Sequence, residues 1–437
     1  MIKSTIRLIL TLALLPAMLQ AQTVKKLSLN EALELGIANS KNLKLAQNKI
    51  EQAAAQLDVV KDNALPNASA SLMYNHAEIP THTLNMGGDP INLPNRSDAF
   101  IGTAGIEQLV FGGNKLKYAK ESTKLLGDLA QLDLEKNSED VRYAVINTWF
   151  TLYKLKQSKS VVAQNLESIA SQLKQAEQFF NQGLVTKNDV LRFQLQQANV
   201  HLTELEIENN RKIVNYNLDI LLGLPEDTEI EVETSDAALQ TLAPLASYMD
   251  MAASGRQELQ QLDVQDKVAG LNLKSIKAEK LPTVGIAANT YFVNPSGHFI
   301  PHTDEYIMPV TLGATISWNI ANLWKNKNKA AEARIQQQEI HLQKDILSDQ
   351  VKTQVNKEYR NYEIALQKID VLQTSLAQAE ENDRLLASKY RNNIASAIDR
   401  IDAETLLYQA KINLEMAKAD AGLAYYTLLK STGKISK

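Results

Sequence analysis

The segment 308–320, MPVTLGATISWNI, alternates between apolar residues and small or polar residues. Apolar residues at a period of two predict a β-strand with one apolar face and one small, polar face. These positions are Met308, Val310, Leu312, Ala314, Ile316, Trp318 and Ile320. A similar alternation covers 284–292, directly after Leu281-Pro282. The two segments have 13 and 9 residues, and both reach the length of about 9 to 11 residues that a barrel strand needs to cross a bilayer.

The sequence after this strand pair has the spacing of long helices. No proline follows Pro309, and apolar residues step by three and four along 407–428, as in a coiled-coil seam. The tract between Pro94 and Pro225 also lacks proline and has a looser seam, made of Leu191, Leu195, Ala198, Leu202 and Leu205. Long antiparallel helical hairpins are predicted. The first helix, starting after Gly113, would run for close to 70 residues, about 105 Å.

The same pattern occurs twice along the chain. In the first half, Leu65-Pro66 precedes a strand predicted near 68–76, and a second strand is predicted near 100–110. Each half is therefore expected to contain helix, strand, loop, strand, long helix, turn and long helix, which indicates a duplication. The expected divisions are a signal peptide at 1–21, a first repeat at 22–226, a linker at 227–243 and a second repeat at 244–437.

The N-terminus has the features of a secretory signal peptide. Lys3 and Arg7 precede an apolar run from Leu8 to Met18, and Ala21 offers a cleavage position. The alternative is a membrane anchor, but the run has about 11 residues where a spanning helix needs about 20. Without Lys3 and Arg7, 44 basic residues face 50 acidic ones. This mildly negative balance argues against nucleic acid as a partner.

Catalytic and metal-binding motifs are not found in the sequence. The chain has no cysteine, which excludes disulfides and thiol chemistry. The six histidines lie apart and form no His-Glu-x-x-His motif. An enzyme is therefore the least supported class, and no cofactor or metal is expected.

Four strands are too few to close a barrel within one chain. An open sheet edge in hydrocarbon leaves backbone groups unpaired, at a cost of several kcal/mol each. If these strands lie in a membrane, several copies must contribute to one shared barrel. The alternative is a rod-like periplasmic coiled-coil protein whose alternating segments form a soluble sandwich.

Several segments together resemble the TolC-type outer-membrane efflux proteins, over essentially the whole mature chain. The resemblance rests on LNEAL at 29–33, QLVFGG at 108–113 and GLVTKNDVL at 183–191. Two segments depart from the family pattern. The family's Arg-Pro-Glu-Leu reads RQEL at 256–259, and its Phe-x-Gly-Gly is replaced in the second half by ANLW at 321–324.

The resemblance implies a fold that is mainly α with a membrane β portion. Three copies with four strands each would form a homotrimer, in which a 12-stranded β-barrel continues as an α-helical barrel into the periplasm. The implied function is an outer-membrane channel that serves as a trans-periplasmic exit duct for a tripartite efflux pump or a type I secretion system. The implied partners are a periplasmic adaptor (membrane fusion) protein, an inner-membrane transporter and outer-membrane lipid. A structural periplasmic coiled-coil or adaptor protein and a secreted binding protein are the alternatives.

Two groups of residues are predicted to contact lipid and partner proteins. The apolar strand face at Val310, Leu312, Ile316 and Trp318 is expected to face lipid. By resemblance, the hairpin tips would contact the adaptor. The tip residues are Gly183, Leu184, Val185 and Thr186 in the first half, and Asn393, Ile394, Ala395 and Ser396 in the second. A simple helix–helix turn is the alternative interpretation of these segments.

Two acidic residues are predicted to line a periplasmic gate. Asp399 and Asp402 are three residues apart and so share one face of a helix. They match the family's acidic positions at the periplasmic entrance, where three copies would bring six carboxylates together and favour cations. A solvated helix face is the alternative. Tyr390 and Asp189 match a family pair that hydrogen-bonds between hairpins, and they are the candidate latch.

Overall fold

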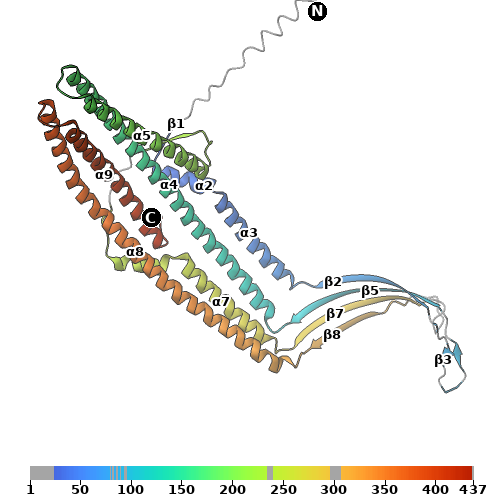
Figure 1. The fold of residues 1–437 in the computed structure, drawn as a ribbon. Helices are drawn as coiled ribbons and strands as arrows, with labels where there is room; N and C mark the ends of the chain where they lie inside the picture. Colours follow the sequence, from blue (N-terminus) through green and yellow to red (C-terminus); the bar gives the residue numbers. More distant parts are fainter. Residues whose placement is uncertain are drawn as a thin grey trace, which may run out of the picture. The chain divides into compact units, whose positions relative to one another are not determined.

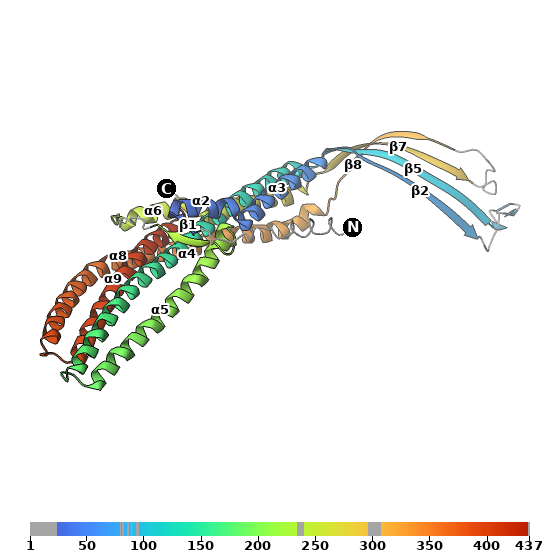
Figure 2. The same cartoon turned by 90° about the horizontal axis from the view of Figure 1, so that it is seen from above.

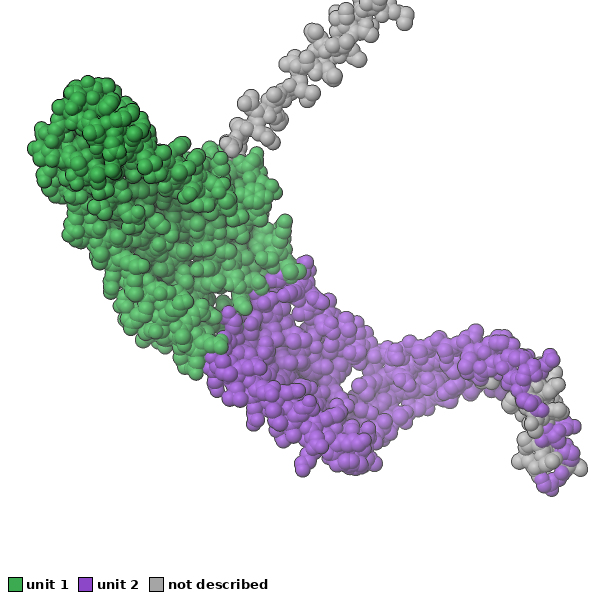
Figure 3. Space-filling view, viewed as in Figure 1, with its two compact units in different colours: residues 1–45, 134–257, 348–437 green, residues 46–133, 258–347 purple. Residues whose placement is uncertain are grey.

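The computed structural model describes residues 24–78, 80, 83–84, 87–88, 90–92, 96–233, 240–295 and 307–435. The predicted signal peptide lies outside these residues. The chain divides into two compact units, which Figure 3 colours separately. Unit 1 contains Met1–Leu45, Leu134–Gln257 and Ser348–Lys437, and unit 2 contains Ala46–Asp133 and Glu258–Leu347. Both halves of the sequence contribute to each unit.

The order of elements repeats in the two halves, as the sequence predicted. The first half contains α2 (Leu29–Asn39), α3 (Lys41–Asp62), β2 (Asn67–Glu78), β5 (Arg96–Phe111), α4 (Lys115–Asn181) and α5 (Lys187–Leu222). The second contains α6 (Leu245–Gly255), α7 (Gln257–Ala278), β7 (Thr283–Pro295), β8 (Val310–Ser317), α8 (Asn322–Arg391) and α9 (Ala397–Ser431). The two-residue strands β3 (Thr83–Leu84) and β4 (Ile91–Asn92) lie in the loop of the first strand pair.

Unit 2 contains a four-stranded antiparallel sheet in the order β2-β5-β7-β8 (Figures 1 and 2). Ser71 pairs with Thr103, Gly102 with Phe292, and Ala288 with Leu312. The register between β5 and β7 shifts between Leu109 and Phe111. Among the described residues of the single chain, β2 and β8 each have one neighbouring strand, so both edges of this sheet are open there.

The last strand is shorter than the sequence predicted. The alternation suggested a strand over 308–320, but β8 covers only Val310–Ser317. The indole N–H of Trp318 donates to the backbone oxygen of Lys280 at 3.0 Å, and the turn that starts α8 follows. β8 therefore ends one residue before Trp318, and the expected contact of Trp318 with lipid stays a prediction.

The long helices confirm the prediction from the proline-free tracts. α4 has 67 residues and α8 has 70. At 1.5 Å per residue, each is about 100 Å long. Side-chain caps begin several of the helices. At the start of α2, the Ser28 backbone N–H donates to Glu31 Oε2 at 2.9 Å and the Glu31 N–H donates to Ser28 Oγ at 3.3 Å, which together form a capping box.

The main core of unit 1 surrounds two aromatic side chains of α4. Trp149 and Phe150 are almost fully buried, and their rings meet edge to face at a centroid distance of 5.2 Å. Gly422 of α9 allows Phe150 to approach, because a Cβ at Gly422 would lie 2.5 Å from Phe150 Cε1. This glycine therefore brings α9 close to α4.

A small parallel strand pair lies beside this core, and the sequence did not predict it. β1 (Val24–Leu27) pairs with β6 (Glu229–Val232), which lies in the expected linker. Asn215 of α5 positions β6: its Nδ2 donates to Thr228 O at 2.7 Å, and its Oδ1 accepts from Ile230 N at 2.8 Å. The same Nδ2 donates to Oδ2 of Asp219, a fully buried carboxyl in the last turn of α5.

Candidate functional site

The two hairpin tips, which lie at the same end of unit 1 (Figure 1), have the same backbone hydrogen bonds. Gly183 N donates to Phe180 O and Leu184 N to Phe179 O, both at 2.9 Å. In the second tip, Asn393 N donates to Tyr390 O at 3.0 Å and Ile394 N to Lys389 O at 2.9 Å. Gly183 and Asn393 both have positive φ, 75° and 59°, as this turn requires after a helix. The duplication therefore extends to individual turn residues.

A capping box follows each tip and holds an aspartate in place. Asp189 Oδ2 accepts from Thr186 N at 2.8 Å and from Thr186 Oγ1 at 2.7 Å. Asp399 Oδ2 accepts from Ser396 N at 3.1 Å and from Ser396 Oγ at 2.7 Å. These hydrogen bonds stabilise the first turns of α5 and α9.

The tips present one large apolar side chain each to solvent. Leu184 and Ile394 are exposed, at 51% and 74% of their surface. The next residue, Val185 or Ala395, is half-buried at each tip. Behind the turns, the aromatic side chains of Phe193 and Tyr390 are buried, so Leu184 and Ile394 are the exposed apolar residues of the two turns. Such isolated apolar groups on a rigid turn can anchor a partner helix.

The predicted gate residues both lie on the exposed surface of α9. Asp402 is exposed one turn beyond Asp399, as the spacing predicted. The hydrogen bonds from the side chain and the backbone of Ser396 lower the pKa of the Asp399 carboxyl below its ordinary value. Asp399 is therefore a cap as well as a candidate gate residue, and the sequence argument had considered only the second role.

The predicted latch pair is close together but does not form a hydrogen bond. Tyr390 is buried against Phe179 and Phe193, at ring centroid distances of 5.9 and 5.8 Å. Its hydroxyl has no hydrogen-bond partner. Burial raises the pKa of Tyr390, and the charge of Asp189 raises it further. The Asp189 carboxylate accepts hydrogen bonds from Thr186 at the start of α5 and none from Tyr390. The latch hydrogen bond between Tyr390 and Asp189 therefore stays a prediction.

The sheet in unit 2 has one apolar face and one small, polar face. Val310, Leu312 and Ile316 project to the apolar face and are 74%, 84% and 73% exposed. The register brings apolar residues of the other three strands to the same face, namely Ala68, Leu72, Ile106, Ala104, Ile286 and Ala288. The opposite face carries mainly small polar residues, namely Ser69, Ser71, Thr103, Asn289, Thr311 and Thr315, together with Met73, Ile101 and Tyr291. Side chains alternate between faces along each strand, so the register alone separates the two sets.

An aromatic pair and then a charged group follow the apolar band on β2 and β5. The rings of Tyr74 and Phe100 lie 5.0 Å apart. Beyond them, Asp98 accepts from Tyr74 Oη at 2.8 Å and lies 2.7 Å from His76 Nδ1. Phe111 lies at the other end of β5. The strand rises about 37 Å from Phe100 to Phe111, so a tilt of about 45° gives an apolar height of about 26 Å, close to that of outer-membrane barrels.

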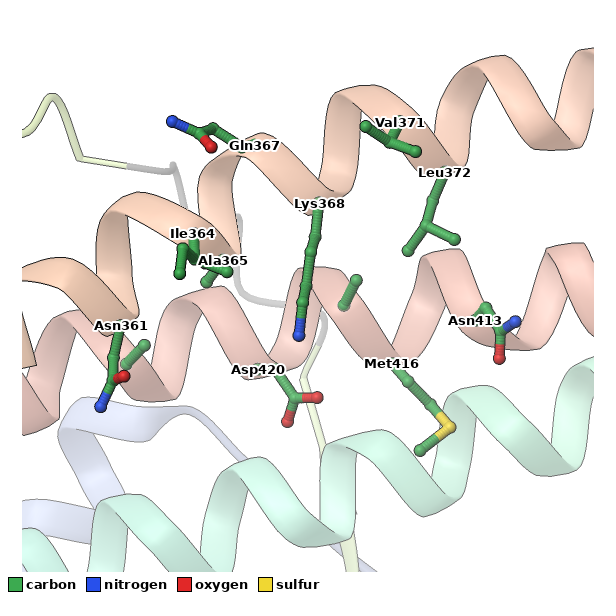
Figure 4. Close-up of a pocket in the computed structure, with 12 residues that line it drawn as sticks. Asn361, Ile364, Ala365, Gln367, Lys368, Val371, Leu372, Asn413, Met416 and Asp420 are labelled. Carbon is green, nitrogen blue, oxygen red and sulfur yellow. The ribbon is translucent and has the colours of Figure 1, made fainter.

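Unit 1 also has an open groove between α8 and α9, shown in Figure 4. Its volume is about 820 Å³. Apolar side chains line its length, namely Ile364, Ala365, Val371, Leu372, Met416 and Ala417. Val371 is 68% exposed although it is surrounded by apolar neighbours. A second set of exposed leucines lies along α5, namely Leu191, Leu195, Leu202 and Leu205.

A cluster of buried ionisable and amide side chains joins α4, α8 and α9, and the sequence did not predict it. Arg400 and Glu404 of α9 are buried, and Arg400 Nη1 pairs with Asp383 of α8. Glu404 accepts hydrogen bonds from amide side chains of α4.

The described helices contain no stretch that is long and apolar enough to cross a membrane. In the described part of the chain, no cluster of three His, Cys, Asp or Glu side chains has a geometry that could hold a metal ion.

Comparisons with known proteins agree on one family and one fold. A family model described as outer membrane efflux protein matches residues 32–224. The outer membrane efflux protein BepC of Brucella suis biovar 1 (strain 1330) is 20% identical over 346 residues, which are 77% of this chain and 73% of BepC. The structure of CusC has a TM-score of 0.77 at 14% identity, with 93% of this chain and 92% of that chain covered. VceC from Vibrio cholerae has a TM-score of 0.73 at 15% identity, with 93% and 96% covered.

Proposed function

We propose that this chain, which belongs to the TolC-type outer-membrane efflux protein family, assembles as a homotrimer that forms an exit duct across the periplasm. The chain is an outer-membrane protein that extends into the periplasm, and it is not an enzyme. In the proposed assembly, three four-stranded sheets close one barrel, and the helical hairpins continue it as an α-helical barrel.

The observation that carries this proposal is the open sheet of unit 2. Its apolar face is exposed along the whole length of β8, and β2 and β8 both lack an outer neighbour in the single chain. Each unpaired backbone group would cost several kcal/mol in hydrocarbon. Pairing β8 of one copy with β2 of the next satisfies both edges, and three copies give the even strand number that such barrels have.

The helices of unit 1 offer surfaces that fit the same assembly. The groove between α8 and α9 is open and lined by apolar side chains together with Lys368, Asp420 and three amide side chains, and the leucines of α5 are exposed at heptad-like spacing. Apolar seams at this spacing are normally buried against another helix. We propose that α5 of one copy covers the groove of its neighbour, which buries both surfaces.

The hairpin tips support a role in binding a periplasmic adaptor protein. Leu184 and Ile394 are exposed on turns with the same geometry, so each chain presents two similar apolar anchors. Through the adaptor, the duct would serve an inner-membrane transporter of a tripartite efflux pump or a type I secretion system. The transporter would then select the substrate.

The oligomeric state in detergent tests the assembly. Wild type is expected to sediment as a trimer in analytical ultracentrifugation. Val371→Glu places a charge in the α8–α9 groove, so this variant is expected to sediment mainly as a monomer. Gln373→Glu adds the same charge on an exposed part of α8 and should leave the trimer intact. A wild type that is monomeric at all protein concentrations would refute the proposal.

Single-channel recording tests the proposed gate. Asp399→Ala would remove the cap together with the charge, whereas Asp399→Asn keeps an oxygen that can accept from Ser396. The double variant Asp399→Asn with Asp402→Asn is therefore expected to lose cation block while the hairpin stays folded. Asp349→Asn, at an exposed aspartate of α8, is the matched control. Unchanged cation block in the double variant would rule out this gate.

A further inference from the structure

The buried cluster in unit 1 connects the two helical hairpins close to their tips. Arg400, Glu404 and Gln172 are each 6% exposed, and Asn165 is 8% exposed. Asn165 and Gln172 belong to α4, whereas Arg400 and Glu404 belong to α9. The cluster is formed within one chain and does not need a second copy.

The hydrogen bonds of this cluster leave Glu404 without a close cation. Arg400 Nη1 pairs with Asp383 of α8, and Arg400 Nη2 is 3.9 Å from Glu404 Oε2. The carboxylate instead accepts from Asn165 Nδ2 at 3.3 Å and from Gln172 Nε2. A buried carboxylate held mainly by neutral amides loses much of its hydration without gaining a full ion pair.

Two acceptor atoms beside Glu404 have no donor. Asn165 Oδ1 and Gln172 Oε1 are both buried without a hydrogen-bond partner. An unsatisfied buried acceptor costs about 1–3 kcal/mol. An ionised carboxylate has no hydrogen to offer, whereas a protonated carboxyl supplies one O–H donor. If the side-chain amide of Asn165 or Gln172 rotates by about 180°, its oxygen faces Glu404. The protonated carboxyl can then donate a hydrogen bond to that oxygen.

A cavity of about 60 Å³ gives this carboxyl access to water. A water needs about 10–15 Å³ of such space, so the cavity holds a few. The ionisable groups that face it are Asp383 of α8 and Glu404, Tyr408 and Lys411 of α9. α4 contributes Asn165, Ser168, Val161 and Gln164, none of which is ionisable.

Burial raises the pKa of Glu404 above its ordinary value of 4.5. Hydrogen bonds from Ser168 and Gln172 and the charge of Arg400 act in the opposite direction, and the charge of Asp383 adds to the effect of burial. The native chain therefore binds a proton more readily than the unfolded chain does. Stability from this group is present at low pH and is lost as the pH rises through the raised value.

We infer that Glu404 is a proton-binding site that couples the contact between the α4–α5 and α8–α9 hairpins to pH. The proton removes a buried charge and lets the carboxyl donate to one amide oxygen of α4, in place of the hydrogen bond that this amide donates to the ionised form. Loss of the proton leaves the two amide oxygens of α4 unsatisfied and weakens the contact. The inference goes beyond the proposed function, because it concerns packing within one chain.

Hydrogen exchange of the purified full-length protein tests this site. Protection factors of peptides covering 161–173 and 400–411 are measured between pH 4.5 and 8, relative to intrinsic rates at each pH. In wild type they are expected to fall about tenfold as pH rises, because the ionised carboxylate leaves buried acceptors of α4 unsatisfied. Glu404→Gln, which is neutral and nearly isosteric, is expected to stay protected over the whole range. Glu415→Gln, on the same helix but at a surface pair with Lys418, should behave like wild type.

Two results would overturn the inference. One is a wild type whose protection at 161–173 does not change with pH. The other is a Glu404→Gln protein that loses protection equally at every pH, because the ionised carboxylate would then be the stabilising form. If Glu404→Gln does not fold, Gln172→Met serves instead. It removes one donor to the carboxylate and should move the wild-type transition to higher pH. These peptides report on the single chain, so a failed trimer proposal would not produce either result.

Discussion

Replacement of Asp219 by asparagine should stabilise the protein at alkaline pH. This carboxyl is fully buried in the last turn of α5, where Asn215 Nδ2 donates to Oδ2 at 2.9 Å. Its Oδ1 has no hydrogen-bond partner. Burial, together with the charge of Asp227, raises the pKa of Asp219 from 3.8 to about 6. The C-terminal end of a helix also disfavours a negative charge.

The size of the expected stability gain follows from the difference between the pKa values of 3.8 and about 6. Between pH 3.8 and about 6 the native chain binds more protons at Asp219 than the unfolded chain, so stability falls as pH rises through this window. A shift of about two units corresponds to about 3 kcal/mol, all of which is lost well above pH 6. Asparagine resembles the neutral carboxyl in shape. The stability gain of Asp219→Asn over wild type should therefore grow by about 2–3 kcal/mol from pH 4 to pH 8.

Urea unfolding followed by circular dichroism at pH 4, 6 and 8 measures this gain. Asp250→Asn, at an exposed position of α6, is the control and should show little difference from wild type at any of these pH values. The reasoning is refuted if Asp219→Asn is destabilised by the same amount at pH 4 and pH 8. That result would mean that the hydrogen-bond geometry around Asn215, and not the buried charge, dominates at this site.

Two further substitutions test packing and membrane contact. Gly422→Ala should lower the free energy of unfolding by about 1–3 kcal/mol, because its Cβ would lie 2.5 Å from Phe150 Cε1, and equal stability in urea would contradict this close contact. Gly127→Ala, at a helical position with open space around it, should be neutral or stabilising. Leu312→Lys on the apolar face should cost about 2–4 kcal/mol in the membrane and reduce recovery in the outer-membrane fraction, whereas Thr311→Lys on the opposite face should not. Equal recovery of both lysine variants would show that the faces are assigned wrongly.

The helical hairpins and three of the four long strands could be predicted because their signals are local. Proline-free tracts with three- and four-residue apolar spacing specify α5 and α9 without any tertiary information. The end of β8 could not be predicted this way. The alternation of residue types continues through Trp318, but the pairing with β7 stops at Ser317, opposite Thr283, and the Trp318 indole donates to Lys280, which is 38 residues away in sequence. The sequence does not predict the pairing of β1 with β6 either, because four-residue strands about 200 residues apart give no periodic signal.

The backbone conformation of the candidate site could be predicted from the sequence, but the burial of its ionisable side chains could not. Gly183 indicated the first turn, and the internal repeat carried that turn to Asn393, where positive φ is confirmed. The double role of Asp399 could have been recognised from the Ser-x-x-Asp spacing at 396–399, which is typical of a capping box. The environment of Glu404 could not, because burial depends on how α4 packs against α9.

The open edges of the sheet also constrain the order of events during biogenesis. A single chain that inserted β2 and β8 into lipid before it met another copy would keep unsatisfied backbone amides at both edges. In water, the exposed apolar face of its sheet would promote aggregation. In the proposed trimer, subunits would therefore meet while the strands are kept from both lipid and water, by a holding chaperone or at the insertion machinery. Overproduction of the chain beyond the capacity of that machinery should then yield periplasmic aggregates rather than half-inserted monomers.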